Sequence, residues 1–226
     1  NNFQGDVEIY DANLSGQLWR DEAGNKFLGD RPEQIKKRIQ EYQPDVVGIS
    51  NMFTWQFSQA LLVARLCREI DSNIVTVIGG PHASSFPKET SNEPDIDYVV
   101  MGEGEIRFFE LLEAIQLGEK HQIQGVVQKE GDLGLLKPSR RSPIRFIPDL
   151  DALPLPAYDM VNVEEYFSLQ EKGFSSRPRS RGKRSVSMLT SRGCPHQCIF
   201  CSIQATMGYK WRYHSPEYVQ KHIDLI

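Results

Sequence analysis

The stretch NIVTVIGGPHAS, Asn73 to Ser84, decides the fold class of this sequence. Its first part is rich in β-branched residues, which favour a buried strand, and the two glycines that follow favour a tight turn. On either side in the sequence lie two similar runs, DVVGIS (Asp45 to Ser50) and DYVVMG (Asp97 to Gly102). Segments with helical spacing separate the three runs. This alternation predicts an α/β fold with a parallel sheet.

Two further runs and two helix starts extend this pattern. VEIYD (Val7 to Asp11) and GVVQKE (Gly125 to Glu130) also have the composition of strands. A helix is predicted from Asp30 to Tyr42, because Pro32 suits the first turn of a helix. Another is predicted from about Glu105 to Leu117. Together these elements predict a sheet of five strands with helices between them.

Two predicted helices carry apolar side chains at i, i+4 spacing, which indicates one buried face on each. In the helix that follows the Asp45 strand they are Leu62, Val63, Leu66, Cys67 and Ile70. In the helix that begins near Glu105 they are Phe108, Leu111, Leu112 and Ile115. Cys67 is therefore expected in the core as a small apolar residue.

The composition limits the class of protein. The 226 residues are 39% hydrophobic and 25% charged, which is typical of a globular chain with one large or two small domains. A net charge of -4 gives no basic surface for nucleic acid or an anionic membrane, so the expected partner is a small-molecule substrate or a protein. No run of about 18 apolar residues occurs, and the start lacks the pattern of a secretory signal. We expect a cytoplasmic protein.

Three turns follow the predicted strands, and the carboxyl ends of parallel strands meet at one edge of a sheet, where ligands bind. The turns are SNMFTWQ (Ser50 to Gln56), GGPHAS (Gly79 to Ser84) and GEGE (Gly102 to Glu105). Glycines let a backbone approach a ligand, and the apolar side chains of the first turn offer a surface to a planar one. The alternative is that the glycines only form turns and the aromatic residues are buried. GEGE is not a dinucleotide fingerprint, because the third glycine is replaced by Arg107.

The composition of the sequence changes after about residue 131, where it becomes rich in proline and polar residues. Prolines interrupt IPDLDALPLPAYDM (Ile147 to Met160), which indicates a linker that packs on a neighbour. The basic run SSRPRSRGKRS (Ser175 to Ser185) is interpreted as a loop, with phosphate binding as the alternative. SVSMLTS (Ser185 to Ser191) then predicts a strand. Pro216 opens a last helix that continues to residue 226.

The cysteines lie in TSRGCPHQCIFCS, Thr190 to Ser202. The chain has four cysteines, and three of them, Cys194, Cys198 and Cys201, are spaced C-x3-C-x2-C. Such crowding is typical of metal ligands and not of a disulfide framework. Three chemistries fit: a zinc site completed by His196, a redox pair with one unexplained cysteine, or an iron–sulfur cluster with one open iron.

The cysteine loop resembles the signature of radical S-adenosylmethionine (SAM) enzymes, C-x3-C-x-aromatic-C, with Phe200 as the aromatic residue. The resemblance implies that Cys194, Cys198 and Cys201 hold a [4Fe-4S] cluster and that SAM chelates the fourth iron. It places Phe200 near the adenine of SAM. It also implies a one-electron donor such as flavodoxin or ferredoxin, and a 5′-deoxyadenosyl radical that abstracts hydrogen from a substrate.

The preceding part is similar to the cobalamin-binding domain of one subgroup, the cobalamin-dependent radical methyltransferases. SNMFTWQ, GGPHAS, MGEGE and LDALPLPAYDM carry this similarity. No histidine has an aspartate two residues earlier, so the D-x-H-x-x-G ligand of other cobalamin domains is not expected; the histidines are His82, His121, His196, His214 and His222. The expected cobalamin-binding residues are Ser50, Met52, Phe53, Thr54, Gln56, Gly79, Gly80, Pro81, His82, Gly102, Glu103, Gly104 and Glu105.

The resemblance also implies the domain order. Residues 1–130 form a Rossmann-like cobalamin-binding domain, residues 131–184 a linker, and residues 185–226 the beginning of a radical SAM (βα) partial TIM barrel. One strand and one helix are expected before Val7, and further βα units after the cysteine loop.

The function implied is methylation of an unactivated carbon or phosphorus centre of a small molecule, with SAM both as radical source and as methyl donor to the corrin. Two alternatives stay open. One is cyclisation or rearrangement on the same cofactors without net methylation. The other is a zinc-stabilised module that binds small molecules without radical chemistry.

Overall fold

The computed structural model describes residues 5–118, 122–128, 146–173 and 184–226. Its main sheet has the order β3 (Val46–Ser50), β4 (Val75–Gly79), β5 (Tyr98–Val100) and β6 (Val126–Gln128). β3, β4 and β5 are parallel, with Ser50 opposite Gly79 and Gly79 opposite Val100. The predicted α/β class with a parallel sheet is therefore confirmed, and so are the strands at Asp45, Asn73 and Asp97.

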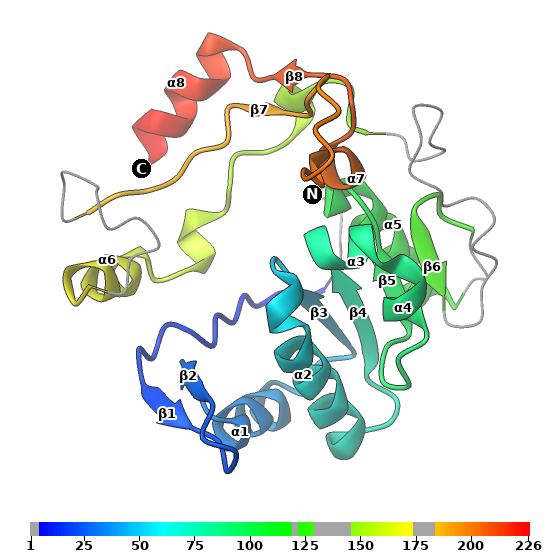
Figure 1. The fold of residues 1–226 in the computed structure, drawn as a ribbon, viewed down its shortest axis with the longest axis vertical. Helices are drawn as coiled ribbons and strands as arrows, with labels where there is room; N and C mark the ends of the chain where they lie inside the picture. The colour runs from blue at the N-terminus through cyan, green and yellow to red at the C-terminus, as the bar shows by residue number, and fades with distance from the viewer. Residues whose placement is uncertain (1–4, 119–121, 129–145, 174–183) are drawn as a thin grey trace.

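Helices cover both faces of this sheet (Figure 1). α1 (Pro32–Tyr42) packs against α2 (Phe57–Ile70) on one face, and α5 (Gly104–Leu117) covers the other. The three predicted helices are confirmed. Short helices lie at the ends of the strands: η1 (Thr54–Gln56), α3 (Pro81–Ser85) and α4 (Pro87–Ser91).

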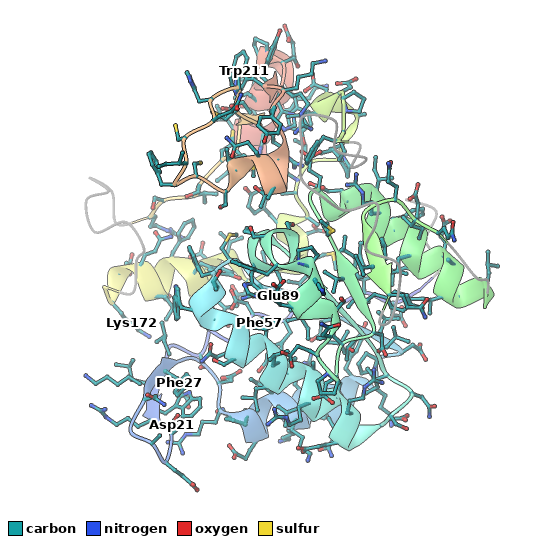
Figure 2. All side chains as sticks on the ribbon, turned by 45° about the vertical axis from the view of Figure 1, so that its right-hand side comes forward. Asp21, Phe27, Phe57, Glu89, Lys172 and Trp211 are labelled. Atoms are coloured by element: carbon teal, nitrogen blue, oxygen red, sulfur yellow. The ribbon has the colours of Figure 1, made fainter. Side chains whose placement is uncertain are left out.

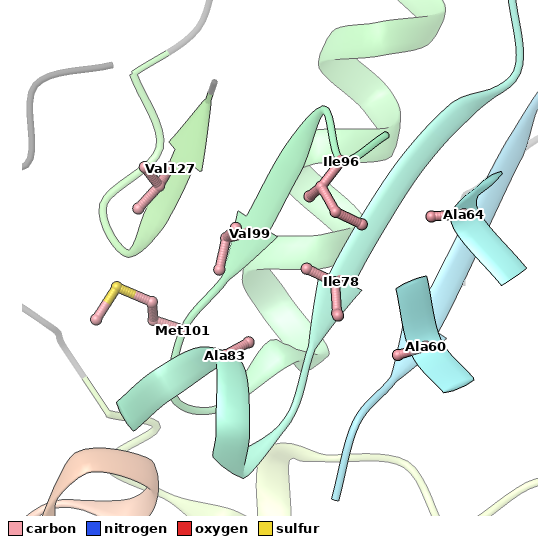
Figure 3. Packing of buried hydrophobic residues seen from close by; sticks show 8 residues of the cluster. All are labelled: Ala60, Ala64, Ile78, Ala83, Ile96, Val99, Met101 and Val127. Atoms are coloured by element: carbon pink, nitrogen blue, oxygen red, sulfur yellow. The ribbon is translucent and has the colours of Figure 1, made fainter. Parts of the chain in front are cut away.

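The core between α2 and the sheet combines small helix residues with branched strand residues (Figure 3). Ala60 and Ala64 of α2 let the helix approach Ile78 of β4 and Val99 of β5. Cys67 lies on the same helix in a second cluster that faces α1, and it is fully buried as predicted. Burial raises the pKa of its thiol to about 11, because a thiolate would lose its hydration there.

The direction of β6 differs from the prediction of an all-parallel sheet, because β6 runs antiparallel to β5. The reason lies in residues 122–125, which run back along α5 before the strand begins. Arg107 of α5 donates a hydrogen bond from Nε to the Gln124 carbonyl at 2.7 Å. The chain therefore enters β6 at the carboxyl edge of the sheet. Residues 129 and 130 of the predicted strand lie outside the described residues.

The predicted strand from Val7 to Asp11 is wrong. Val7 and Ile9 are exposed, and the segment has no strand partner within the described chain. Polar contacts hold it instead: Glu8 pairs with Arg38, and Asp11 accepts a 2.7 Å hydrogen bond from Tyr166. The nearby strands are β1 (Leu18–Arg20) and β2 (Lys26–Leu28), a separate antiparallel hairpin that the sequence pattern did not reveal.

The connector, residues 131–184, is described at 146–173, and its Ile147 amide donates a 2.7 Å hydrogen bond to Glu103 in the turn after β5. It contains η3 (Leu150–Ala152), η4 (Tyr158–Met160) and α6 (Val163–Glu171). The elements beyond it are β7 (Ser191–Arg192), α7 (Ile203–Met207), β8 (Arg212–Tyr213) and α8 (Pro216–Leu225). Figure 2 shows Trp211, beside β8, at the opposite end of the molecule from Asp21 and Phe27 of the β1–β2 hairpin.

The predicted strand from Ser185 to Ser191 is wrong except at its last residue. β7 begins only at Ser191, where the chain meets β8 and pairs with it antiparallel. Earlier residues have no ladder because no other strand lies beside them in the described chain. The last helix is confirmed, since the Ser215 side chain accepts a 3.1 Å hydrogen bond from the Tyr218 amide at the start of α8. His121 and residues 175–183 of the basic run lie outside the described residues.

Candidate functional site

The three predicted turns meet at the carboxyl edge of the sheet. Ser50 and Gly79 end neighbouring parallel strands in register, and Val100 ends the next strand two residues before Gly102. The turns that begin at Ser50, Gly79 and Gly102 are therefore side by side. The sequence prediction that these segments share one edge is confirmed by this register.

A close backbone crossing at Gly80 holds the first two turns together. The Asn51 amide donates a 2.9 Å hydrogen bond to the Gly79 carbonyl, and the His82 amide donates a 3.3 Å bond to the Asn51 carbonyl. Gly80 has φ +101°, and a Cβ atom there would lie 2.7 Å from the Asn51 carbonyl oxygen. Only glycine combines this backbone angle with this separation. Gly80 is thus needed to build the edge.

Ser84 connects the second turn to the third. Its buried hydroxyl donates a 2.9 Å hydrogen bond to the Gly80 carbonyl and accepts a 2.8 Å bond from the Gly102 amide. Pro81 occupies the first turn of α3, where its missing amide hydrogen costs nothing. These contacts fix the separation of the two glycine turns.

His82 is enclosed behind this edge. Its ring lies between Phe57, with centroids 4.1 Å apart, and Phe86, with centroids 5.2 Å apart. Nδ1 is 3.2 Å from the Thr54 hydroxyl, and Nε2 is buried with no partner among the described residues. Burial lowers the pKa of the imidazole, because the charged form would lose hydration. Burial thus disfavours the charged form of His82, and its ring contacts the Thr54 hydroxyl.

The apolar residues of the first turn point outward, which contradicts the alternative that they are buried cover. Met52, Phe53 and Trp55 have exposed fractions of 55%, 53% and 73%. The Phe53 and Trp55 rings stack with centroids 6.1 Å apart. Asn51 between strand and turn is only 2% exposed, and its side-chain oxygen has no hydrogen-bond partner in the described chain. An exposed apolar surface beside an unpaired polar atom is typical of a ligand site.

The carboxylates of the third turn have protein partners. Glu103 is buried and accepts hydrogen bonds from the Ile147 amide at 2.7 Å and from Arg212 at 2.9 Å. Arg192 lies 3.3 Å from Glu103 and 2.7 Å from Glu105. These acidic side chains therefore join the sheet edge to the cysteine region, while the Gly102 and Gly104 backbone remains at the edge.

The cysteine loop follows β7 and precedes α7, which packs against α3 of the sheet edge. All three of its thiols are free, with Cys198 and Cys201 exposed and Cys194 partly buried. The Cys201 amide donates a 3.0 Å hydrogen bond to the Cys198 carbonyl, which turns the loop. Gly193 has φ +84°, and a Cβ there would lie 2.1 Å from the Lys210 carbonyl oxygen. Glycine is therefore required directly before the first cysteine.

The three cysteine thiols of the loop are the kind of ligand that an iron–sulfur cluster takes. In the described chain, which includes the whole loop, no three His, Cys, Asp or Glu side chains are arranged to hold a single metal ion. A cluster binds its cysteines through different irons, so their sulfurs need not converge on one point. The Phe200 side chain beside Cys201 is exposed, and so is Ile199. The His196 carbonyl accepts a hydrogen bond from the side-chain Nε2 of Gln204.

Comparison with known proteins decides what the first region is. Residues 6–112 match the family model of the B12 binding domain. This part of the chain is therefore similar to B12-binding domains. Among the described residues no helix is long and apolar enough to cross a membrane.

Curated relatives extend this relationship over most of the chain. It is 34% identical to an uncharacterized methyltransferase of Pyrococcus horikoshii over 85% of this chain and 39% of the relative. It is also 34% identical to the cytidylyl-2-hydroxyethylphosphonate methyltransferase of Streptomyces wedmorensis over 84% of this chain and 39% of that protein. A cobalamin-dependent radical SAM methyltransferase of Streptomyces tokunonensis is 29% identical over 80% of this chain and 25% of its own length. These relatives confirm the resemblance to cobalamin-dependent radical SAM proteins.

The solved structures agree on the fold. The chain matches the radical SAM methyltransferase TsrM of Kitasatospora setae, determined with cobalamin and a [4Fe-4S] cluster bound, with TM-score 0.58 and 20% identity. The match covers 84% of this chain and 37% of TsrM. The chain thus spans about two fifths of the length of the first relatives it matches.

Sequence reasoning missed four residues that build these regions, namely Asn51, Ser84, Arg192 and Arg212. Asn51 and Ser84 lie in two of the predicted ligand-binding turns, so their positions close to the end of a strand could have identified them. Arg192 and Arg212 meet Glu103 across 89 and 109 sequence positions. No local pattern indicates such a contact.

Proposed function

We propose that this chain is the cofactor-binding part of a cobalamin-dependent radical SAM methyltransferase that acts on a carbon or phosphorus centre of a small molecule. The proposal rests on one observation above all. An apolar, exposed sheet edge in the part of the chain similar to B12-binding domains lies next to a loop of three free cysteines with the radical SAM spacing. Names of relatives that methylate a phosphonate or belong to the cobalamin-dependent radical SAM group support this assignment.

We assign cobalamin to the carboxyl edge of the sheet. The exposed side chains of Met52, Phe53 and Trp55 would cover an apolar face of the corrin, and the backbone of the two glycine turns would allow its close approach. The remaining residues of the proposed contact surface are Ser50, Thr54, Gln56, Gly79, Gly80, Pro81, Gly102 and Gly104. His82 is assigned to the support of Thr54, since its ring is enclosed between two phenylalanines.

We assign the [4Fe-4S] cluster to Cys194, Cys198 and Cys201, and the adenine of SAM to Phe200. Bound there, the cluster and cobalamin would supply radical formation and methyl transfer respectively. The chain's own residues would hold the two groups near each other and orient SAM. The exposed loop leaves the cluster reachable by a one-electron donor such as flavodoxin or ferredoxin. Free thiols suit a reducing compartment, so we place the protein in the cytoplasm.

We propose the domain division of the sequence prediction, with residues 1–130 for cobalamin, 131–184 as connector and 185–226 for the start of the radical SAM domain. The connector is held by both neighbours. The Ile147 amide binds Glu103 of the first part, and Asp151 accepts a hydrogen bond from the Ser215 amide of the third at 3.1 Å.

The function is tested in the full-length protein, anaerobically reconstituted with iron, sulfide and hydroxocobalamin, by following SAM that carries an isotopically labelled methyl group. We expect both 5′-deoxyadenosine and S-adenosylhomocysteine, and the label in a product when candidate phosphonates and small-molecule extracts are supplied. 5′-Deoxyadenosine without S-adenosylhomocysteine, with no label transfer and with a cyclised product, would favour cyclisation. Absence of both coproducts from a protein with full iron and cobalt would contradict the proposal.

A further inference from the structure

A single buried carboxylate joins both ends of the cysteine loop to the cobalamin edge. The Glu103 side chain is only 3% exposed and lies directly after Gly102 of the edge. Arg192 approaches it from β7, two positions before Cys194, and Arg212 approaches it from β8, beyond α7. These two arginines are also paired in the β7–β8 ladder. The cysteine loop is therefore a closed segment whose two-stranded base rests on Glu103.

The contact of Glu103 with Arg192 and Arg212 is called the joint. The partners of Arg212 fix the orientation of the two segments that meet at this joint. Its guanidinium donates to Glu103 at 2.9 Å, to the Ile147 carbonyl at 2.6 Å and to the Met207 carbonyl at 2.7 Å. The Ile147 amide returns a 2.7 Å bond to Glu103. One arginine thus links the end of α7, the connector and the first domain. Hydrogen bonds in three directions fix orientation as well as distance.

Charge balance argues that the joint serves geometry more than stability. Glu103 and Glu105 face Arg192 and Arg212, and the buried Arg107 guanidinium donates to the Glu103 carbonyl at 2.7 Å. Two negative and three positive groups thus lie in a buried or partly buried place. Dehydrating such groups offsets most of their attraction, so a well-packed apolar contact would hold the domains as firmly. An apolar contact would not select one orientation of the loop.

We propose that Glu103 is a positioning residue that sets the orientation of the cysteine loop over the cobalamin edge through Arg192 and Arg212. This rests on the proposed function, in which the loop carries the cluster and the edge carries the corrin. Glu103 touches neither group. Its loss would leave both cofactor sites intact but misalign them. Because a misplacement of about 1 Å can cost on the order of 100-fold in rate, radical formation would then be uncoupled from methyl transfer.

The test compares Glu103→Gln with Glu113→Gln in the full-length protein. Glu103 is the N-cap residue of α5, and Glu113 is exposed on α5 itself. Glu113→Gln therefore makes the same chemical change away from the contact with the arginines. In the protein without cofactors, we expect amide hydrogen exchange of residues 193–211 to rise about tenfold or more in Glu103→Gln and to stay unchanged in Glu113→Gln. This readout does not depend on the proposed chemistry.

In the reconstituted protein, Glu103→Gln should keep wild-type iron and cobalt contents and raise the ratio of 5′-deoxyadenosine to methylated product about tenfold or more. Loss of cobalt binding would instead place Glu103 on the corrin and overturn the positioning role. Unchanged exchange together with an unchanged ratio would overturn it as well.

A second variant keeps the test valid if Glu103→Gln does not fold. Arg212→Lys retains the positive charge but cannot donate in three directions at once, so the same increases in exchange and ratio are expected. Wild-type behaviour of a folded Arg212→Lys would overturn the proposal. If the wild-type protein forms neither coproduct, the proposed function fails, while the exchange measurement still decides whether Glu103 positions the loop.

Discussion

The sheet edge and the cysteine loop are built in opposite ways. At the edge, Asn51 and Ser84 are buried, and their hydrogen bonds connect all three turns. In the loop, Cys198 and Phe200 are exposed, and few main-chain bonds hold the turn. Hydrogen bonds within the protein hold the first surface together. The second has its three cysteines in order along the chain and its base fixed on Glu103.

This difference predicts how much each region must rearrange to bind its proposed cofactor. An apolar edge held by protein contacts needs little rearrangement to accept a flat ligand. Under the proposed function, a loop of exposed thiols would gain its order from the cluster it binds, which would couple binding to local folding. The following predictions test the contrast, beginning with the largest effect.

Thiol reactivity should separate the two regions most strongly. With a pKa raised to about 11 and no access to solvent, Cys67 should react with iodoacetamide at least ~100-fold more slowly than Cys198 and Cys201. Peptide mass spectrometry of the apoprotein at intervals measures the rates, with denatured protein as the control for complete labelling. Equal rates for Cys67 and Cys198 in the native protein would show that the core around α2 is not closed.

Glycine substitution should reveal how tightly the edge is built. Gly80→Ala should lower the free energy of unfolding by about 3 kcal/mol, because both the backbone angle and the contact with Asn51 are unfavourable to a Cβ. Gly118→Ala is the matched control, since Gly118 also has positive φ but no atom within 4 Å of an added Cβ, and should cost about 1 kcal/mol. Denaturant unfolding gives both values, and equal costs would contradict the crossing at Gly80.

Serine in place of cysteine should distinguish a core thiol from a ligand thiol. Cys67→Ser buries a hydroxyl among apolar side chains and should destabilise the apoprotein by about 2 kcal/mol. Cys201→Ser changes an exposed side chain and should stay within about 0.5 kcal/mol of wild type. Thermal unfolding of the two variants without metal measures this difference. A larger loss for Cys201→Ser would mean that the loop is structural even without a ligand.

The smallest effect concerns pH. Because the pKa of His82 is lowered in the folded protein, the unfolded chain binds a proton more readily at this residue. The contribution of His82 to the free energy of unfolding is therefore fully present above its ordinary pKa near 6.5 and is lost as the pH falls. Wild type should therefore lose up to about 1.4 kcal/mol per pH unit more than His82→Gln between pH 6.5 and 5. Parallel stability curves for the two proteins over this range would contradict a lowered pKa of the buried His82.

The sequence predicts those parts of the fold that depend on local pattern. The strands ending at Ser50 and Gly79 and the stripe that includes Cys67 follow from composition and spacing alone. The direction of β6 and the lack of a strand at Val7 cannot be predicted in this way, because both depend on residues far away in the sequence. Arg107 bonds to the segment before β6, and Tyr166 bonds to Asp11 after the Val7 segment. In the site, the cysteine spacing and the glycine turns can be recognised in the sequence. The contacts of Glu103 with the two arginines cannot, because they join segments that are far apart in the sequence.

The most direct test of two separate cofactor surfaces is iron, sulfide, cobalt and zinc analysis of the anaerobically reconstituted full-length protein and two variants. Wild type should retain iron, sulfide and cobalt. Cys198→Ala should lose iron and sulfide but keep cobalt, and Phe53→Asp, which places a charge on the exposed apolar edge, should lose cobalt but keep iron. Loss of both metals together in either variant, or tight zinc in place of iron in wild type, would contradict the account.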